Sequence, residues 1–408
     1  MIGPHDMDRS PAPSGQAMGS ASEVFLVFLR LGLTSFGGPI AHLGYFRRQF
    51  VARLGWLDEA QFAQLLAVCQ FLPGPASSQL GFAIGLFRAG WRGALAAFIA
   101  FTAPSALLLF AFAAAAPLIQ SGIGLAVIHG FKLVAVSVVA HSLLGMARQL
   151  TPDLPRAALA VGACALLLFQ TSALSQLLVI AVGALLGPWV CRRVPAQAFA
   201  VFPVNYGPKA ALVALAVFAL GLGTALAMTS PNPSLGSLAA AFYKAGALVF
   251  GGGHVVLPLL QQSTVASGWV SGDTFLAGYG AAQAVPGPMF SFSAFLGAQV
   301  PTGNPSAVGA LVALLAVFVP GFLLLVAALP FWARLASAPG AARVVAGVNA
   351  VVVGLLAAAF YNPVWTQGVL TWTDFVIALI GFLLLTRVSA LWVLVWCVAA
   401  SVVRFALV

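Results

Sequence analysis

Residues 36–39 read FGGP and residues 70–81 read QFLPGPASSQLG, and the chain contains both motifs a second time, as FGGGH at 250–254 and QAVPGPMFSFSA at 283–294. The first pair of motifs is offset by 214 residues and the second pair by 213 residues. Two unusual motifs in the same order, with offsets that differ by one residue, are typical of an internal repeat. The repeat therefore organises the whole chain.

The repeat continues beyond these motifs with a slowly drifting offset. Pro104 aligns with Pro320 at an offset of 216 residues, and Lys132 aligns with Asn349 at 217, as short loop insertions would produce. A tail rich in Pro, Gly and Ser precedes the first copy, and we expect it to be disordered. The predicted division of the chain is a tail over residues 1–22, an N-terminal repeat over 23–230 and a C-terminal repeat over 231–408.

The composition indicates that lipid is the solvent of this chain. Of 408 residues, 62% are hydrophobic and 6% are charged, whereas a globular domain carries about 25% charged residues. Apolar windows of roughly 17 to 25 residues fit helices that cross the hydrocarbon core. The sequence therefore predicts an all-α polytopic membrane protein, whose glycine- and proline-rich motifs interrupt its helices.

Several kinds of function are disfavoured by the same composition. The net charge of +10 reflects basic cytoplasmic loops, and no soluble basic domain is present to bind nucleic acid. No motif pairs a nucleophile with a base, so we expect no enzyme. We also expect no cofactor and no metal site, because the cysteines lack paired spacing; they are Cys69, Cys164, Cys191 and Cys397.

Basic residues differ between the two copies of the repeat. Arg47, Arg48 and Arg53 lie between the two motifs of the first half, and Arg88 and Arg92 follow its PGP motif, whereas the aligned loops of the second half contain no Lys or Arg. Because Lys and Arg concentrate in cytoplasmic loops, matched loops of different charge indicate opposite sides of the membrane. We therefore expect an inverted-topology repeat in a multi-pass protein with a cytoplasmic N-terminus.

The segment that contains the first PGP motif has basic residues at both of its ends. A re-entrant hairpin would keep both ends in the cytoplasm, and PGP would divide it into two helices of about a dozen residues. The alternative is one kinked segment that crosses the whole bilayer, and both interpretations stay open at this point.

The four breaks are the candidate binding points, because non-helical backbone inside a membrane is tolerated where it is buried or lines a wet cavity. A helix that restarts after PGP offers free N–H groups and serine hydroxyls, which suit an oxyanion. The alternative is that Gly and Pro only pack and kink helices. The candidates are Gly37, Gly38, Gln70, Pro75, Ser77 and Ser78 in the first half and Gly251, Gly252, Gln283, Pro288 and Ser291 in the second.

Three cations lie inside apolar stretches. Arg30 and Lys244 each lie six residues before the Phe of the first motif, so the repeat keeps a cation at one equivalent position, and Lys132 has apolar sequence on both sides. A charge within the membrane is by default a candidate functional group. The alternative is that these side chains snorkel to the interface.

No carboxylate lies in the middle of an apolar stretch, since all eight acidic residues fall in tails, loops or helix ends. Cation transporters and most proton relays place carboxylates inside the membrane, so we expect an anionic substrate. His129, His141 and His254 are the candidates for a proton-linked role, because imidazole titrates near neutral pH. A plain hydrogen-bonding role is the favoured interpretation for each of them.

The motifs resemble those of the chromate ion transporter family in its long two-domain form. The resemblance rests on FGGP with HLGYFRRQFV, on GWLDEAQF and QFLPGPASSQLGFAIG, and on FGGGH and QAVPGPMFSFSAFLG, and it covers nearly the whole chain. It implies an inner-membrane protein that exports chromate, with homologous halves in opposite orientation, and that draws on the proton-motive force. Because sulfate is similar to chromate, the resemblance also makes sulfate a related ligand.

We therefore expect alternating access, with chromate bound between the two broken motifs, in a protein whose partners are the anion and the lipid bilayer; a homodimer is the assembly considered. Two alternatives stay open. One is a carrier or channel for another oxyanion such as sulfate, and the other is a membrane scaffold without transport.

Overall fold

The computed structural model describes residues 19–36, 38–115, 122–170, 172–192, 206–228, 230, 232–250, 253–332 and 340–407. Within these ranges the chain forms helices and no strand. Six helices are long and apolar enough to cross a membrane, and large apolar side chains such as Phe169 (92% exposed) face outward. The predicted all-α polytopic membrane fold is confirmed, while most of the predicted tail lies outside the described residues.

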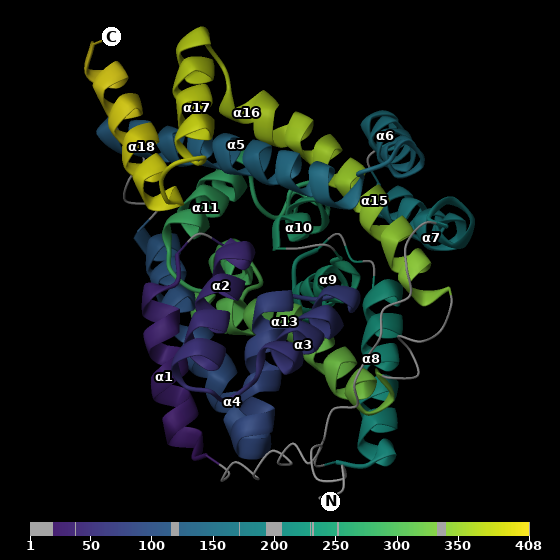
Figure 1. Cartoon of the computed structure of the whole chain (residues 1–408). Helices are drawn as coiled ribbons and strands as arrows, with labels where there is room; N and C mark the ends of the chain where they lie inside the picture. Colours follow the sequence, from purple (N-terminus) through teal and green to yellow (C-terminus); the bar gives the residue numbers. More distant parts are fainter. Residues whose placement is uncertain are drawn as a thin grey trace, which may run out of the picture.

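Figure 1 shows the long helices in two layers. The lower layer contains α1 (Ala21–Thr34), α4 (Ala76–Ala115), α8 (Pro208–Ala227), α9 (Leu235–Leu248) and α13 (Ser306–Ala328). The upper layer contains α5 (Ile123–Leu150), α6 (Leu154–Phe169), α7 (Ala173–Val190), α15 (Ala341–Ala359), α17 (Trp372–Leu384) and α18 (Ala390–Leu407). Two short helices, α10 (Val256–Thr264) and α11 (Gly272–Ala284), lie between the layers.

The lower layer repeats one helix pair. In the first half α1 packs on α4, and in the second half α9 packs on α13. The contacts are so close that only glycine fits: a Cβ on Gly32 would lie 2.8 Å from the carbonyl oxygens of Ala100 and Phe101, and a Cβ on Gly246 would lie 2.0 Å from that of Val317. Gly32 and Gly246 are equivalent positions of the repeat, so both copies use the same packing.

The upper layer exchanges helices between the halves. The α6–α7 pair of the first half packs on α15 of the second, and the α17–α18 pair of the second half packs on α5 of the first. Glycine again permits the approach, because a Cβ on Gly130 of α5 would lie 2.6 Å from Val398 of α18, and one on Gly347 of α15 would lie 2.6 Å from Gly187 of α7. Neither half buries its own long helix alone.

Both PGP motifs break a helix, as the sequence predicts. The first break separates α3 (Glu59–Phe71, 13 residues) from α4. Helix α4 is interrupted again at Ala89 and Gly90, which have non-helical dihedral angles. The chain reverses there, because a Cβ on Gly85 would lie 2.4 Å from the carbonyl oxygen of Gly93, a contact that a continuous helix could not make.

The second PGP motif leads into a matching reversal. It is followed by η4 (Met289–Ser291) and α12 (Phe292–Gln299), which returns to α13 through a short loop. A Cβ on Gly297 of α12 would lie 2.3 Å from the carbonyl oxygen of Gly309. Each half therefore contains two short helical pieces around PGP, followed by a turn onto a long helix.

Two helices, α3 and α11, follow Gly55-Trp56 and Gly268-Trp269 and begin at equivalent N-caps. The Asp58 side chain accepts a hydrogen bond from Gln61 N (2.7 Å), and the Ser271 side chain accepts one from Thr274 N (3.1 Å). Near the first cap, exposed Arg47 in η1 (Arg47–Arg53) donates to Glu59, and this hydrogen bond lowers the pKa of the Glu59 carboxyl. Free backbone N–H groups at a helix start account for the polar caps.

The two copies of the motif region have different surroundings. Helix α11 packs on α5, and α10 packs on α15 and α7. In the first half, α2 (Gly38–Phe46) and α3 pack on α4 and on η1, and α3 has no comparable contact with α15. Among the described residues, the upper layer thus packs mainly on the motif region of the second half.

Replacing Gly246 with Ala should destabilise the lower layer, because the new Cβ would overlap the backbone of Val317. Overpacking of this kind costs about 1–3 kcal/mol. We expect a lower melting temperature of the detergent-solubilised protein. The control is Gly223→Ala in α8, where nothing lies within 4 Å of the added Cβ; equal melting temperatures for the two variants would contradict the packing described.

Candidate functional site

Two backbone hydrogen bonds tie the broken segments of one half to those of the other. Gly74 N, in the first PGP motif, donates to Val249 O (2.8 Å), next to the second FGG motif. Gly287 N, in the second PGP motif, donates to Ser35 O (3.0 Å), next to the first FGG motif. The donors are equivalent positions of the repeat and so are the acceptors, so one contact is made twice, as a two-fold relation requires.

We call the contact between the halves that these two hydrogen bonds make the crossing. Around Gly74, a glutamine closes the crossing. Gln79 Nε2 donates to Pro73 O (3.1 Å) and to Gly321 O (2.9 Å) of α13. Gly74 has φ 131°, and a Cβ there would lie 2.8 Å from Gln79 Nε2. Only glycine suits this position, because L residues with side chains rarely adopt such a φ and no room exists for a side chain.

Around Gly287 the crossing is closed by two serines. Ser105 Oγ lies 2.6 Å from Ser291 Oγ and donates to Thr102 O (2.9 Å). Gly287 has φ 106°, and a Cβ there would lie 2.9 Å from Ser105 Oγ. Ser105 follows Pro104 as Gly321 follows Pro320, so equivalent residues of α4 and α13 approach the PGP motif of the opposite half.

Several buried polar atoms at the crossing have no hydrogen-bond partner among the described residues. They are Ser35 Oγ, His42 Nδ1, Ser78 Oγ, Gln79 Oε1 and Thr102 Oγ1. All five belong to the first half, and the residues that carry them are at most 3% exposed. Buried polar groups are normally paired, so a polar ligand would form the most new hydrogen bonds with this set of atoms.

The predicted binding residues at the breaks divide into two groups. Pro75, Ser77, Ser78, Pro288 and Ser291 are buried beside the crossing. Gln283 is also buried, and its Nε2 lies 3.4 Å from Met289 Sδ, whereas its equivalent Gln70 is exposed on α3. Gly38 has φ 75° with open space around it, and the predicted Gly37, Gly251 and Gly252 lie outside the described residues.

The three predicted cations do not share one environment. Arg30 is exposed on α1. Its equivalent Lys244 is half-buried and lines a small pocket with Gln176, Gln262 and Ser263. The two cations therefore occupy equivalent positions of the repeat, but their surroundings differ.

The third cation, Lys132, is paired with a carboxylate. Its Nζ lies 2.6 Å from Asp273 Oδ1, and this ion pair joins α5 to the start of α11. The Lys132 side chain is 9% exposed and that of Asp273 is 68% exposed. The same two helices touch at Gly280, where a Cβ would lie 2.0 Å from Phe131 O. A carboxylate at a helix start thus reaches a cation that the sequence places deep in an apolar stretch.

One of the three candidate histidines, His254, belongs to a polar chain. His254 Nδ1 lies 2.7 Å from the hydroxyl of Tyr279 in α11, and Gln283, one turn along, interacts with the same hydroxyl. The chain runs from the second FGG motif to the second PGP motif. His141 of α5 lies outside this chain, and its ring contacts that of Phe382 in α17, with ring centroids 6.0 Å apart.

The third candidate histidine lies in a separate cluster. His129 Nε2 is 2.8 Å from Asp374 Oδ1 of α17, and Arg404 of α18 forms a short ion pair with the same oxygen. Asp374 is fully buried. The three residues come from positions 129, 374 and 404, so the sequence alone gave no signal of their contact.

Other residues of the crossing were not predicted either. Gln79, Thr102 and Ser105 carry the hydrogen bonds or unpaired hydroxyls described above, and Tyr279 connects His254 to Gln283. A signal existed for Ser105, which adjoins the aligned Pro104. None existed for Thr102, whose role depends on how α4 meets the second half.

The chain is similar in sequence to known proteins over most of its length. A family model described as "Chromate transporter" matches residues 22–188 and 236–402. The chain is 30% identical over 353 residues to the probable chromate transport protein of Synechococcus elongatus, which covers 83% of this chain and 84% of that protein. It is 29% identical over 355 residues to the chromate transport protein of Pseudomonas aeruginosa, covering 83% and 80% of the two chains. No solved structure matches the chain.

The glycines of the crossing provide a prediction. Gly74→Ala and Gly287→Ala should each lower the melting temperature by a similar amount, because each forces an unfavourable φ and a side-chain overlap at an equivalent position. Local backbone strain of this kind costs on the order of 1–3 kcal/mol. Gly145→Ala is the control, since nothing lies within 4 Å of its Cβ. A large loss in one variant and none in the other would contradict the reciprocal crossing.

Proposed function

The chain belongs to the chromate transporter family, and on this premise we propose that it exports chromate across the inner membrane by alternating access, driven by the proton-motive force. The observation that carries the proposal is the reciprocal pair of hydrogen bonds between Gly74 and Val249 and between Gly287 and Ser35. Two broken segments that meet through a two-fold relation inside the membrane are the usual site of a transporter built from repeats.

We place chromate beside the crossing, against the unpaired hydroxyls of the first half. Chromate presents four oxygens, and Ser35, Ser78 and Thr102 each have a buried hydroxyl without a partner among the described residues. The free N–H groups after Pro75 add a partial positive charge at the restart of α4. The predicted residues at the second break, Pro288 and Ser291, would complete the site from the opposite half.

The orientation of the two halves is part of the proposal. The two-fold relation of the crossing is compatible with an axis in the membrane plane, and the basic loops of the first half have uncharged counterparts in the second. Because basic loops stay cytoplasmic, these observations together support an inverted repeat with re-entrant PGP segments. An N-terminus in the cytoplasm follows from the same argument.

The difference between the two motif regions supports alternation. The upper layer is docked on α11 through Lys132 and Asp273. The equivalent contact would join α3 to α15, where Ala60 replaces Asp273 and Asn349 replaces Lys132. Asn349 Oδ1 is buried without a partner among the described residues. We propose that the second state docks α3 on α15 and opens the contact between α11 and α5.

The membrane potential favours outward movement of an anion. An inside-negative potential contributes about 2.3 kcal/mol per charge per 100 mV, so a dianion gains roughly twice that amount. Half-buried Lys244 would offset part of the charge, as would Lys132 once released from Asp273. His254, connected through Tyr279 to Gln283 before the second PGP motif, is the proposed route for any coupled proton, and His141 and His129 are further candidates.

Transport in everted vesicles tests the binding site. Ser78→Ala and Thr102→Val should raise KM for chromate about tenfold or more, since a hydrogen bond to a charged group contributes about 1.5–3 kcal/mol. Their melting temperatures should stay near that of the wild type, because these hydroxyls bond nothing in the described protein. Ser291→Ala is the contrasting variant: it removes the bond to Ser105 and should lower stability as well.

The same vesicles separate the alternatives. Preferential uptake of sulfate over chromate would favour a sulfate carrier, and the absence of any flux would favour a scaffold. Unchanged KM in both hydroxyl variants would refute the proposed site while leaving chromate transport intact.

Cross-linking tests the alternation. In a cysteine-free background, Ala67→Cys and Val348→Cys mark the positions of α3 and α15 that correspond to the observed contact of Gly280 with Phe131. We expect cross-linking to increase when Asp273→Asn removes the ion pair with Lys132. Glu59→Gln is the matched control, because it removes only the exposed pair with Arg47. If the active protein does not cross-link under any condition, the proposed docking of α3 on α15 is refuted.

A further inference from the structure

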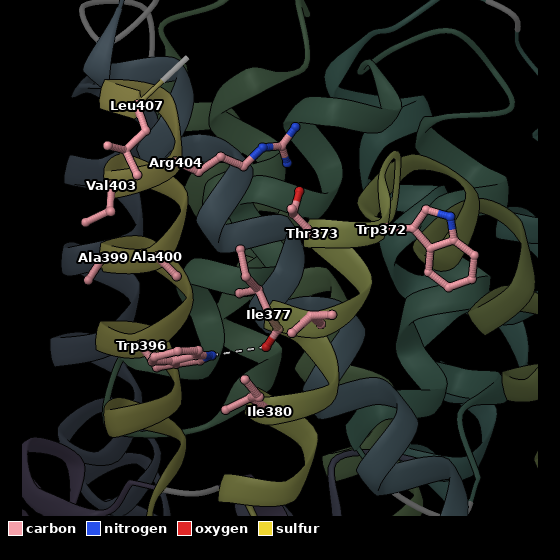
Figure 2. Close-up of a pocket in the computed structure, with 11 residues that line it drawn as sticks. Trp372, Thr373, Ile377, Ile380, Trp396, Ala399, Ala400, Val403, Arg404 and Leu407 are labelled. Carbon is pink, nitrogen blue, oxygen red and sulfur yellow. Dashed lines mark hydrogen bonds between the residues drawn. The ribbon is translucent and has the colours of Figure 1, made fainter.

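A groove on the outer side of the upper layer, between α17 and α18, has the form of a binding site for one lipid chain. Its volume is about 700 Å³, and Figure 2 shows Ile377, Ile380 and Trp396 along its lower part. The Trp396 indole donates to Ile377 O (3.1 Å) on the facing helix, so its only polar atom is already paired. The groove therefore offers an apolar surface to the bilayer.

The upper end of this groove is polar. Figure 2 shows Arg404 and Thr373 at that end, opposite Trp396 and Ile380. Arg404 also lines a second pocket of about 350 Å³, together with His129, Thr371, Asp374 and Ser401. The two cavities thus share the Arg404 side chain, which joins an apolar groove to a polar pocket.

The shared end presents positive charge outward. Asp374 is fully buried and accepts hydrogen bonds from Leu370 N, Thr371 N and Thr371 Oγ1 in addition to those from His129 and Arg404. The Arg404 side chain is 36% exposed. The carboxylate is enclosed and fully occupied, whereas guanidinium has five N–H donors and only part of them meets Asp374.

A second polar group in the pocket lacks a partner. Ser401 is 4% exposed, and its Oγ has no hydrogen-bond partner within the described ranges. It lies one helical turn before Arg404 and lines the same pocket. A buried hydroxyl beside an arginine is suited to a phosphate oxygen.

The height of this pocket also suits a lipid headgroup. The pocket lies where α5 begins, α17 begins and α18 ends. Helices α5 and α18 are long and apolar enough to cross the membrane, and the ends of such helices are expected near its surface. Trp372, 82% exposed at the start of α17, lines the groove at this end. Exposed tryptophans are enriched at the headgroup level.

We propose that this site binds a membrane glycerophospholipid, with one acyl chain in the groove between α17 and α18 and its phosphate on Arg404 and Ser401. The polar pocket receives the phosphate and the apolar groove receives the chain, so both parts of the ligand are specified. The site lies apart from the crossing of the two halves and is independent of the transported anion.

Native mass spectrometry of the full-length protein tests the proposal. After delipidation, the protein is titrated with dioleoylphosphatidylglycerol, and with dioleoylglycerol as the phosphate-free probe. We expect one tightly held phosphatidylglycerol and no tightly held dioleoylglycerol. Arg404→Gln should weaken that binding about tenfold or more, and Ala399→Trp should block it by filling the groove.

Two control variants test whether the loss of lipid binding is specific to this site. Arg387→Gln removes an exposed arginine at the other end of the same helix pair, and Val395→Trp adds a tryptophan on a face of α18 outside the groove; neither should change lipid retention. Since Arg404→Gln also loses a partner of buried Asp374, Ala399→Trp serves as the variant that leaves the ion pair intact. Equal retention in the wild type and Ala399→Trp, or equal binding of both probes, would overturn the proposal.

Discussion

Backbone N–H and C=O groups that leave a helix inside lipid must find partners, because no water is available to them. This chain breaks its helices at both PGP motifs, and each break is paired with the backbone before the FGG motif of the other half. The pairing fixes Gly74 and Gly287 at φ values that favour glycine and leaves no space for a Cβ. Neither half can satisfy its own broken backbone, so the two halves fold as one unit.

The upper layer extends this mutual dependence. The α6–α7 pair covers α15 and the α17–α18 pair covers α5, so each half buries the long helix of the other. Yet among the described short helices of the motif regions, those with extensive contacts to this layer are α10 and α11 of the second half. The side chains explain the preference, because Lys132 and Asp273 form an ion pair at this contact, while the equivalent positions hold Asn349 and Ala60. A symmetric backbone pattern thus carries an asymmetric set of charges.

The charges also show why a cation in an apolar stretch does not define a site. Lys132 is neutralised by Asp273, and Arg30 is exposed. Lys244 and Arg343 are half-buried without an ion pair in the described part of the chain. The unpaired hydroxyls of Ser35, Ser78 and Thr102 mark the crossing more sharply than the cations do, because a buried polar atom without a partner is uncommon.

The sequence by itself determined the membrane class, the repeat, the positions of the breaks and the buried serines after PGP, because composition and motif spacing are properties of the chain alone. The family followed from the same motifs. Only the tertiary structure decided which break meets which, that Gln79, Thr102 and Ser105 surround the crossing, and that Asp273 and Asp374 reach Lys132 and Arg404. Most of these contacts join residues more than a hundred positions apart, and Asp374 and Arg404 are 30 positions apart, so no local pattern records them. They depend on how helices from two halves pack, which is set by the sum of many weak contacts.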